Sequence, residues 1–137
     1  MKFQYLADPR TKDTKGRMVK RPILILELTT KDGSILEVPA LLDSGADRTN
    51  VNFQYADILG VKLGPACETI GVGDGRIEGN IGDFSFTIRN TPWKMTVPAT
   101  YIKSKNVVVL LGREEFFDKF KIKFEQGHDT FELVEVK

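Results

Sequence analysis

The strongest constraint on the fold of this chain is a succession of short, strand-like segments separated by turns. Between residues 84 and 89, phenylalanine or isoleucine alternates with polar residues, which is the period of a half-buried strand. Only two segments, 52–59 and 113–120, predict helices, and they do not alternate regularly with strands. The pattern predicts an all-β domain with one or two short helices. We expect strands at residues 3–6, 22–30, 35–42, 67–72, 84–88, 93–99, 107–111, 121–125 and 130–136.

The length of 137 residues suits one domain with a sizeable core. We expect that domain at residues 22–137, preceded by an N-terminal arm at residues 1–21. From Arg10 to Arg21 the arm has six basic residues and one acidic residue, with Gly16 as a breaker. Such a run is typical of a solvated arm, and ordering against a partner subunit is the alternative.

The composition narrows the classes of function. A net charge of +1 gives no electrostatic reason to expect nucleic acid or an anionic membrane as partner. The longest apolar runs are too short to span a bilayer, and residues 1–21 are too polar for a signal peptide. The single cysteine, Cys67, excludes an internal disulfide and fits a reducing compartment, so we expect the cytoplasm.

Residues 22–42 predict a β-hairpin. Asp32-Gly33 lies between two apolar runs, which is a strong turn signal. Pro39 indicates an edge or a bulge in the returning strand. This hairpin places Asp43 just past the end of a strand.

The segment Asp43-Ser44-Gly45 is the candidate reacting site. Apolar residues precede Asp43 and small residues follow it, so the carboxylate can occupy a crevice with little competition from other side chains. Ser44 adds a hydroxyl, and Gly45 permits close approach of another backbone.

A second feature is the glycine-rich stretch 71–79. It lacks the Lys-Ser/Thr ending of a phosphate-binding loop, and Arg76 stands where the third glycine of a dinucleotide motif belongs. It also runs into strand-like sequence. We therefore expect a hairpin tip, either without a role of its own or acting as a lid.

Other catalytic chemistry finds little support. His128 is the only histidine and lies in a predicted turn, away from Cys67 in the sequence. No cluster has metal-ligand spacing, so we expect no metal and no organic cofactor. Phosphotransferases with an aspartate nucleophile usually have an acid two residues on, where this chain has Gly45.

One mechanism needs only one aspartate from each chain. Two facing carboxylates cannot both ionise, so they share a proton and act as general base and general acid. If each chain supplies only Asp43, the pair forms across a twofold axis and a homodimer is required.

Residues 41–47 (LLDSGAD) and 109–113 (VLLGR) together resemble the retroviral-type aspartic proteases, or retropepsins. The resemblance extends from about residue 22 to residue 136 and is greatest to the single-domain, retropepsin-like proteases of cellular organisms. It implies a homodimeric β-barrel with an active-site turn below a flap hairpin.

The resemblance assigns roles to individual residues. It makes Asp43 catalytic, gives Ser44 a hydroxyl contact across the dimer, and places Gly45 and Ala46 around the carboxylate and at the floor. It pairs Asp47 with Arg113 and sets Leu111-Gly112 beside the turn. It implies a flap that pairs with extended substrate, formed by Gly71, Val72, Gly73, Asp74, Gly75, Arg76 and Ile77.

The chain departs from the retroviral pattern in several places, one of which is an N-terminal arm that is longer and more basic than a minimal retroviral subunit needs. Ser44 replaces a more frequent threonine, residues 52–59 look helical, and charged residues lie near the flap tip. Two hypotheses remain: a homodimeric endopeptidase acting on extended peptide or unfolded protein, and a peptide-binding or assembly module with little catalysis. The intact Asp43-Ser44-Gly45 favours the enzyme.

Overall fold

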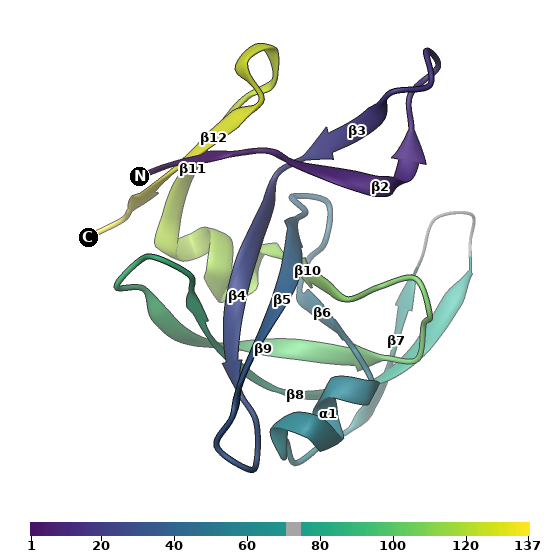
Figure 1. Ribbon diagram of the computed structural model, residues 1–137. Coiled ribbons are helices and arrows are strands. Elements are labelled where there is room, and N and C mark those ends of the chain that lie inside the picture. The colour runs from purple at the N-terminus through teal and green to yellow at the C-terminus, as the bar shows by residue number, and fades with distance from the viewer. Residues whose placement is uncertain (71–74) are drawn as a thin grey trace.

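Six strands close into a barrel in the part of the chain that the computed structural model describes, residues 1–70 and 75–137 (Figure 1). In chain order they are β4 (Ile23–Thr29), β5 (Ile35–Leu42), β6 (Thr49–Asn52), β8 (Arg76–Ile88), β9 (Lys94–Ile102) and β10 (Val109–Leu111). Around the barrel their order is β4-β5-β10-β6-β9-β8, and β8 returns to β4 through two residue pairs. A further strand, β7 (Ala66–Ile70), pairs with the other end of β8. The all-β prediction is confirmed.

The two ends of the chain meet in a small separate sheet. Its strands are β1 (Lys2–Gln4), β11 (Phe120–Glu125) and β12 (Thr130–Glu135), in the order β1-β12-β11. The amino group of Met1 donates to the carbonyl oxygen of Leu133 at 2.8 Å. The termini therefore lie side by side, as Figure 1 shows.

The N-terminal segment is more ordered than its composition indicates. Strands β2 (Leu6–Lys12) and β3 (Met18–Arg21) form a two-stranded hairpin of their own. Asp13 stabilises the turn between them, because its carboxylate accepts the N–H groups of Lys15 and Arg17, both at 2.9 Å. The prediction of a solvated arm missed this hairpin, since local side-chain hydrogen bonds fold a segment that has little apolar surface.

The predicted β4–β5 hairpin is confirmed. Thr30 and Ser34 close its turn through an N–H to carbonyl bond of 2.8 Å, and Gly33 has a φ of 90°, where glycine is favoured. Along β4, every second side chain is buried, which is the pattern of a strand with one face toward the core.

Helix α1 (Gln54–Leu59) is close to its prediction. The side chain of Asn52 accepts the N–H of Gln54 at 3.1 Å, and Gly60, in the left-handed region, ends the helix. The helix expected at 113–120 is instead a π-helical turn, η1 (Arg113–Phe117), with non-helical backbone at Glu114 and Glu115. A short 3-10 turn, η2 (Gln126–His128), joins β11 to β12.

The core fills the barrel and continues under η1. Its largest fully buried side chains include Tyr101, Phe84 and Phe116. Phe116 contacts the rings of Phe86 and Phe120, so this segment turns its aromatic side chains toward the core. Among the described residues, no helix is long and apolar enough to cross a membrane.

Candidate active site

Asp43 lies at the end of β5, where a neighbouring strand fixes the backbone. Leu41 and Leu42 pair in parallel with Leu110 and Leu111 of β10, and the N–H of Asp43 donates to the carbonyl oxygen of Leu111 at 3.0 Å. The Asp43 carboxylate in turn accepts the N–H of Gly45 at 2.9 Å. A Cβ atom on residue 45 would lie 3.2 Å from that carboxylate, which is a tight contact. Glycine is thus suited to this position.

The far side of the turn is held by the segment after β10. The N–H groups of Arg113 and Glu114 donate to the carbonyl oxygens of Ala46 and Asp47, each at 2.9 Å. The turn from Asp43 to Asp47 is therefore hydrogen-bonded at both ends to residues more than sixty positions later.

Gly112 is required at the crossing point of these two segments. A Cβ atom there would lie 2.4 Å from the carbonyl carbon of Arg48, a distance that no side chain tolerates. Its N–H donates to the hydroxyl of the fully buried Thr49 at 3.1 Å. The side chain of Leu111, one residue earlier, is also fully buried. These contacts show that Leu111 and Gly112 lie buried beneath the Asp43 turn.

Two ion pairs lie beside the turn. Arg113 bonds to the carboxylate of Asp47, and Arg48 bonds to that of Glu114 at 3.1 Å. The Asp47 and Arg113 side chains are 89% and 60% exposed, so water screens their attraction. An exposed pair of this kind contributes little to stability.

A groove of about 1280 Å³ runs past the turn. Six of the predicted site residues line it: Asp43, Gly45, Ala46, Asp47, Ile77 and Arg113. Ser44 is exposed beside them, while Leu111 and Gly112 are buried below. The predicted flap residues Gly71, Val72, Gly73 and Asp74 lie outside the described residues.

Strands β7 and β8 form the opposite wall of the groove. Thr69 pairs with Ile77, so their side chains share one face of the hairpin, and both residues line the groove. Gly75 and Arg76 do not line it, and Arg76 bonds to Glu68 at 3.2 Å instead. Strands β7 and β8 therefore pair as a hairpin beside the groove that Asp43 lines.

Unlike Asp47 and Glu114, which also line the groove, Asp43 is not paired with an arginine in the part of the chain that the structure describes. Asp47 and Glu114 are each bonded to an arginine, and Asp118 accepts the N–H of Glu115 at 3.1 Å. Within the described residues, the Asp43 carboxylate has one hydrogen-bond donor, Gly45. It is half-buried and faces the groove.

Sequence reasoning missed several groove residues. Asn50 and Thr100 are buried on neighbouring strands β6 and β9 and line the floor, and Glu114 pairs with Arg48 across it. No spacing signal reveals them, because they reach the groove through strand pairing between distant segments.

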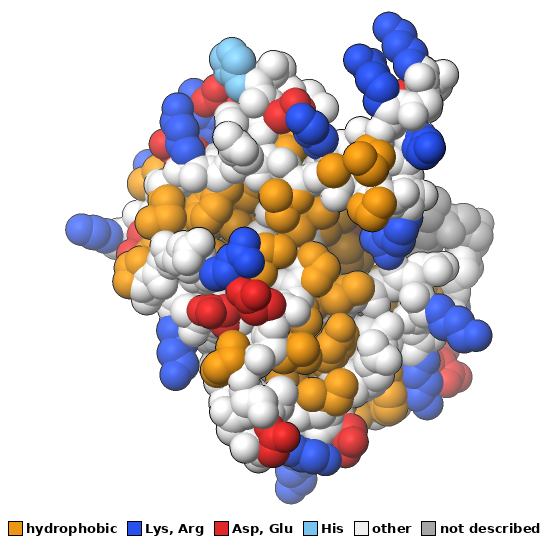
Figure 2. All heavy atoms as spheres, in the orientation of Figure 1, with side chains coloured by type: hydrophobic (Ala, Val, Ile, Leu, Met, Phe, Trp, Pro, Cys, Tyr) orange, Lys and Arg blue, Asp and Glu red, His pale blue; other side chains and the backbone are white. Residues whose placement is uncertain are grey.

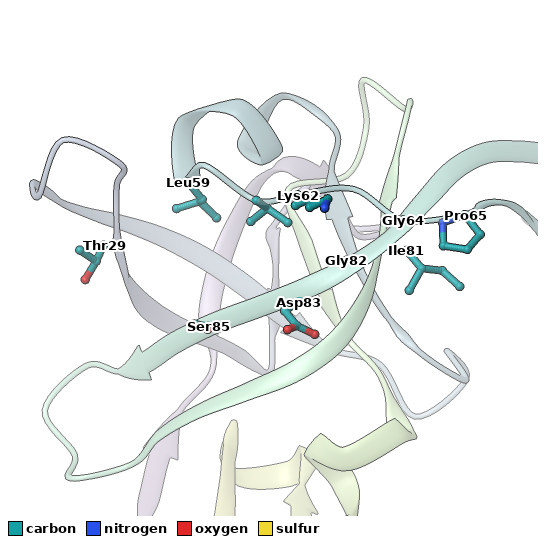
Figure 3. A pocket seen from close by; sticks show the side chains of 10 residues that line it. Thr29, Leu59, Lys62, Gly64, Pro65, Ile81, Gly82, Asp83 and Ser85 are labelled. Carbon is teal, nitrogen blue, oxygen red and sulfur yellow. The ribbon is translucent and has the colours of Figure 1, made fainter.

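A second, smaller cavity of about 420 Å³ lies between the segment after α1 and strand β8 (Figure 3). Lys62 and Asp83 are the ionisable residues that line it, with Leu59, Val61 and Ile81 among the apolar ones. It contains neither Asp43 nor any other predicted site residue.

Comparisons with known proteins support the fold. The sequence matches no protein-family model and no curated protein. A retropepsin-like aspartic protease from Rickettsia conorii aligns over 98% of both chains with a TM-score of 0.55 and 12% identity. The retroviral protease-like domain of Ddi1 from Leishmania major aligns over 83% of this chain and 90% of that domain, with a TM-score of 0.53 and 18% identity.

A third structure is the foamy viral protease-reverse transcriptase dRH in complex with double-stranded DNA. It matches 77% of this chain with a TM-score of 0.52 and 14% identity, and this chain spans only 16% of its length. The barrel, the position of the Asp43 turn and these structures define the fold as that of the retropepsin-like proteases. At these identities the likeness concerns the fold.

Proposed function

We propose that this chain is a homodimeric aspartic endopeptidase that cleaves extended peptides or unfolded protein segments. The observation that carries the proposal is the Asp43 carboxylate, which faces a peptide-sized groove and has one hydrogen-bond donor, Gly45, among the described residues. Similarity to retropepsin-like aspartic proteases in fold supports the same reaction.

The reaction requires a second carboxylate, and a second copy of the chain supplies it. With Asp43 of both subunits facing each other, the pair shares one proton, because two like charges so close cannot both ionise. The ionised carboxylate accepts a proton from water as the water oxygen attacks the peptide carbonyl carbon. The protonated carboxylate donates to the carbonyl oxygen, which gives a tetrahedral diol.

Collapse of this intermediate breaks the carbon–nitrogen bond. The diol returns a proton to the carboxylate pair, and the amide nitrogen accepts one as it leaves as an amine. The products are a carboxylic acid and an amine, and the pair again holds one proton. The β7–β8 hairpin binds the substrate backbone as an added strand, with Gly71 to Ile77 as the flap.

The distribution of exposed apolar side chains supports a second copy. Within the described residues, most large apolar side chains that are exposed lie near the two termini: Met1, Leu6, Met18, Phe124, Val134 and Val136. Figure 2 shows apolar side chains gathered across the face that includes the terminal strands. An exposed apolar surface of this kind marks an interface.

Mixed dimers test the shared pair. We expect wild-type protein to cleave an unfolded substrate and the Asp43→Asn variant to be inactive. Wild type and variant are mixed in equal amounts and allowed to exchange subunits. If each active site needs both carboxylates, activity falls to about one quarter of that of the same total amount of wild type.

The same experiment discriminates against independent subunits. A fall to only about one half would mean that each Asp43 acts alone, and the proposed pair would be wrong. Equal digests from wild type and Asp43→Asn would show that the chain is not an aspartic protease. Retained binding of an uncleaved peptide by both proteins would then favour the peptide-binding module.

A further inference from the structure

The β2–β3 hairpin carries charge opposite in sign to the rest of the chain. Residues 6–21 contain six lysines and arginines and two aspartates. The other 121 residues contain 14 basic and 17 acidic side chains. The near-neutral net charge of the chain therefore conceals a basic hairpin attached to an acidic body.

The two acids of the hairpin are used internally. Asp8 is buried and bonds to Arg10 at 3.2 Å and Arg21 at 3.3 Å, and the Arg10 hydrogen bonds lower the pKa of Asp8. Asp13 bonds to Arg17 at 3.1 Å. Asp8 is thus buried and Asp13 is engaged by its own turn, so the charge that the hairpin presents is mainly basic.

Lys12 and Lys15 are the free charges of the hairpin. Both are exposed, and neither pairs with a carboxylate anywhere in residues 1–70 or 75–137. The hairpin also exposes apolar side chains, Leu6 at 37% and Met18 at 53%. A rigid element with unpaired cations and uncovered apolar side chains is suited to contact another surface.

The point where the β2–β3 hairpin joins the barrel determines which surface the hairpin can contact. Pro22, directly after β3, accepts the N–H of Leu42, the residue before Asp43, at 3.0 Å. The hairpin therefore starts beside the active-site turn and projects away from its own barrel (Figure 1). In the proposed homodimer the two turns meet at the twofold axis, so each hairpin starts at the axis and reaches the second copy.

We propose that the β2–β3 hairpin is a basic arm that packs on the acidic body of the second copy and holds the homodimer together. This inference rests on the proposed function, because the axis at Asp43 determines which side the arm faces. Figure 2 shows basic side chains at the projecting end of the hairpin, where such contacts would form. The opposite charges of arm and body supply the attraction, and Leu6 and Met18 supply apolar contact.

Reversing charge on the arm tests the proposal. We compare the double variant Lys12→Glu/Lys15→Glu with Lys62→Glu/Lys94→Glu, which makes the same change in net charge at exposed lysines of the barrel. Sedimentation equilibrium at about 50 mM salt measures the dimer dissociation constant. We expect a rise of about tenfold in the arm variant and less than about threefold in the control. At about 1 M salt we expect the difference between the two variants to disappear, because the Debye length falls to about 3 Å and charges on the two subunits no longer attract each other.

Each other outcome overturns the proposal in a distinct way. If the two variants have equal dissociation constants and the wild type is a dimer, the arm does not hold the dimer together. The proposed protease function would not be affected by that result. A wild-type chain that is monomeric at every concentration would overturn both proposals. An arm variant that loses affinity for a short DNA duplex but dimerises normally would assign the arm to a polyanion instead. Circular dichroism of both variants confirms that the barrel is folded.

Discussion

The turn at Asp32 and the turn at Asp43 each follow a strand of the same hairpin, and in each the aspartate carboxylate accepts an N–H from two residues on. Asp32 accepts that of Ser34 at 3.0 Å, and Asp43 accepts that of Gly45 at 2.9 Å. Asp32 also accepts the hydroxyl of Thr30, and these bonds lower its pKa to about 2.

The two turns differ in what supports them. The Asp32 turn closes on itself through bonds between Thr30 and Ser34. The Asp43 turn is held from outside by backbone bonds to Leu111, Arg113 and Glu114. The Asp43 turn therefore has backbone support that does not involve its carboxylate.

The largest expected effect is on catalysis. In the proposed mechanism Asp43→Asn removes the general acid and base, so we expect the rate of peptide cleavage to fall at least about a thousandfold. Asp32→Asn changes an aspartate in the same local geometry, and we expect its rate to stay within about twofold of wild type. Cleavage of a fluorogenic peptide library by both variants checks this. Equal losses would mean that Asp43 acts through folding alone.

Because the two turns are supported differently, we expect replacement of a glycine by alanine to destabilise the protein much more at Gly112 than at Gly33. Gly112→Ala forces a Cβ atom to within 2.5 Å of the Arg48 carbonyl, so we expect a loss of more than about 3 kcal/mol or no folded protein. In Gly33→Ala the added Cβ atom has no other atom within 4 Å. We expect a loss of stability of about 1–2 kcal/mol, which comes only from placing alanine in the left-handed region. Urea unfolding measures both. A Gly112→Ala protein as stable as Gly33→Ala would show that the crossing adapts.

A smaller loss is expected at the buried hydroxyl below the Asp43 turn. Thr49→Val keeps the shape of the side chain but leaves the N–H of Gly112 without its acceptor. We expect a cost of about 1–3 kcal/mol by urea unfolding. Thr87→Val, at a half-buried strand position for which no side-chain hydrogen bond is found among the described residues, is the control and should change stability by less than about 0.5 kcal/mol.

The smallest effect is the pH dependence of the Asp32 turn. Because the pKa of Asp32 is lowered in the folded state, its contribution is present above about pH 4 and is lost as the pH falls toward 2. We expect Asp32→Asn to flatten the fall of the melting temperature between pH 4 and pH 2. A curve parallel to that of wild type would show that the turn does not stabilise the fold through this charge.

Part of the site was open to prediction because its signals are local. The hairpin signal at Asp32-Gly33 and the apolar strand before Asp43 placed the carboxylate at a strand end, and the glycine-rich stretch predicted the neighbouring hairpin. The helix predicted at 113–120 is present in part, as the π-helical turn η1 with an irregular start. The N–H groups of Arg113 and Glu114 bond to Ala46 and Asp47, and the backbone at Glu114 and Glu115 is not helical.

The sequence by itself determined the strands, the hairpin turns and the aspartate at the centre of the candidate site, since alternation of side chains and turn-forming residues act over a few neighbours. Only the tertiary structure decided that Gly112 lies under Arg48, that Thr49 supports it, and that residues 6–21 fold into a basic hairpin rooted beside Leu42. These features depend on contacts between segments far apart in the chain. Such contacts form only when the barrel closes, and no local pattern of residues records them.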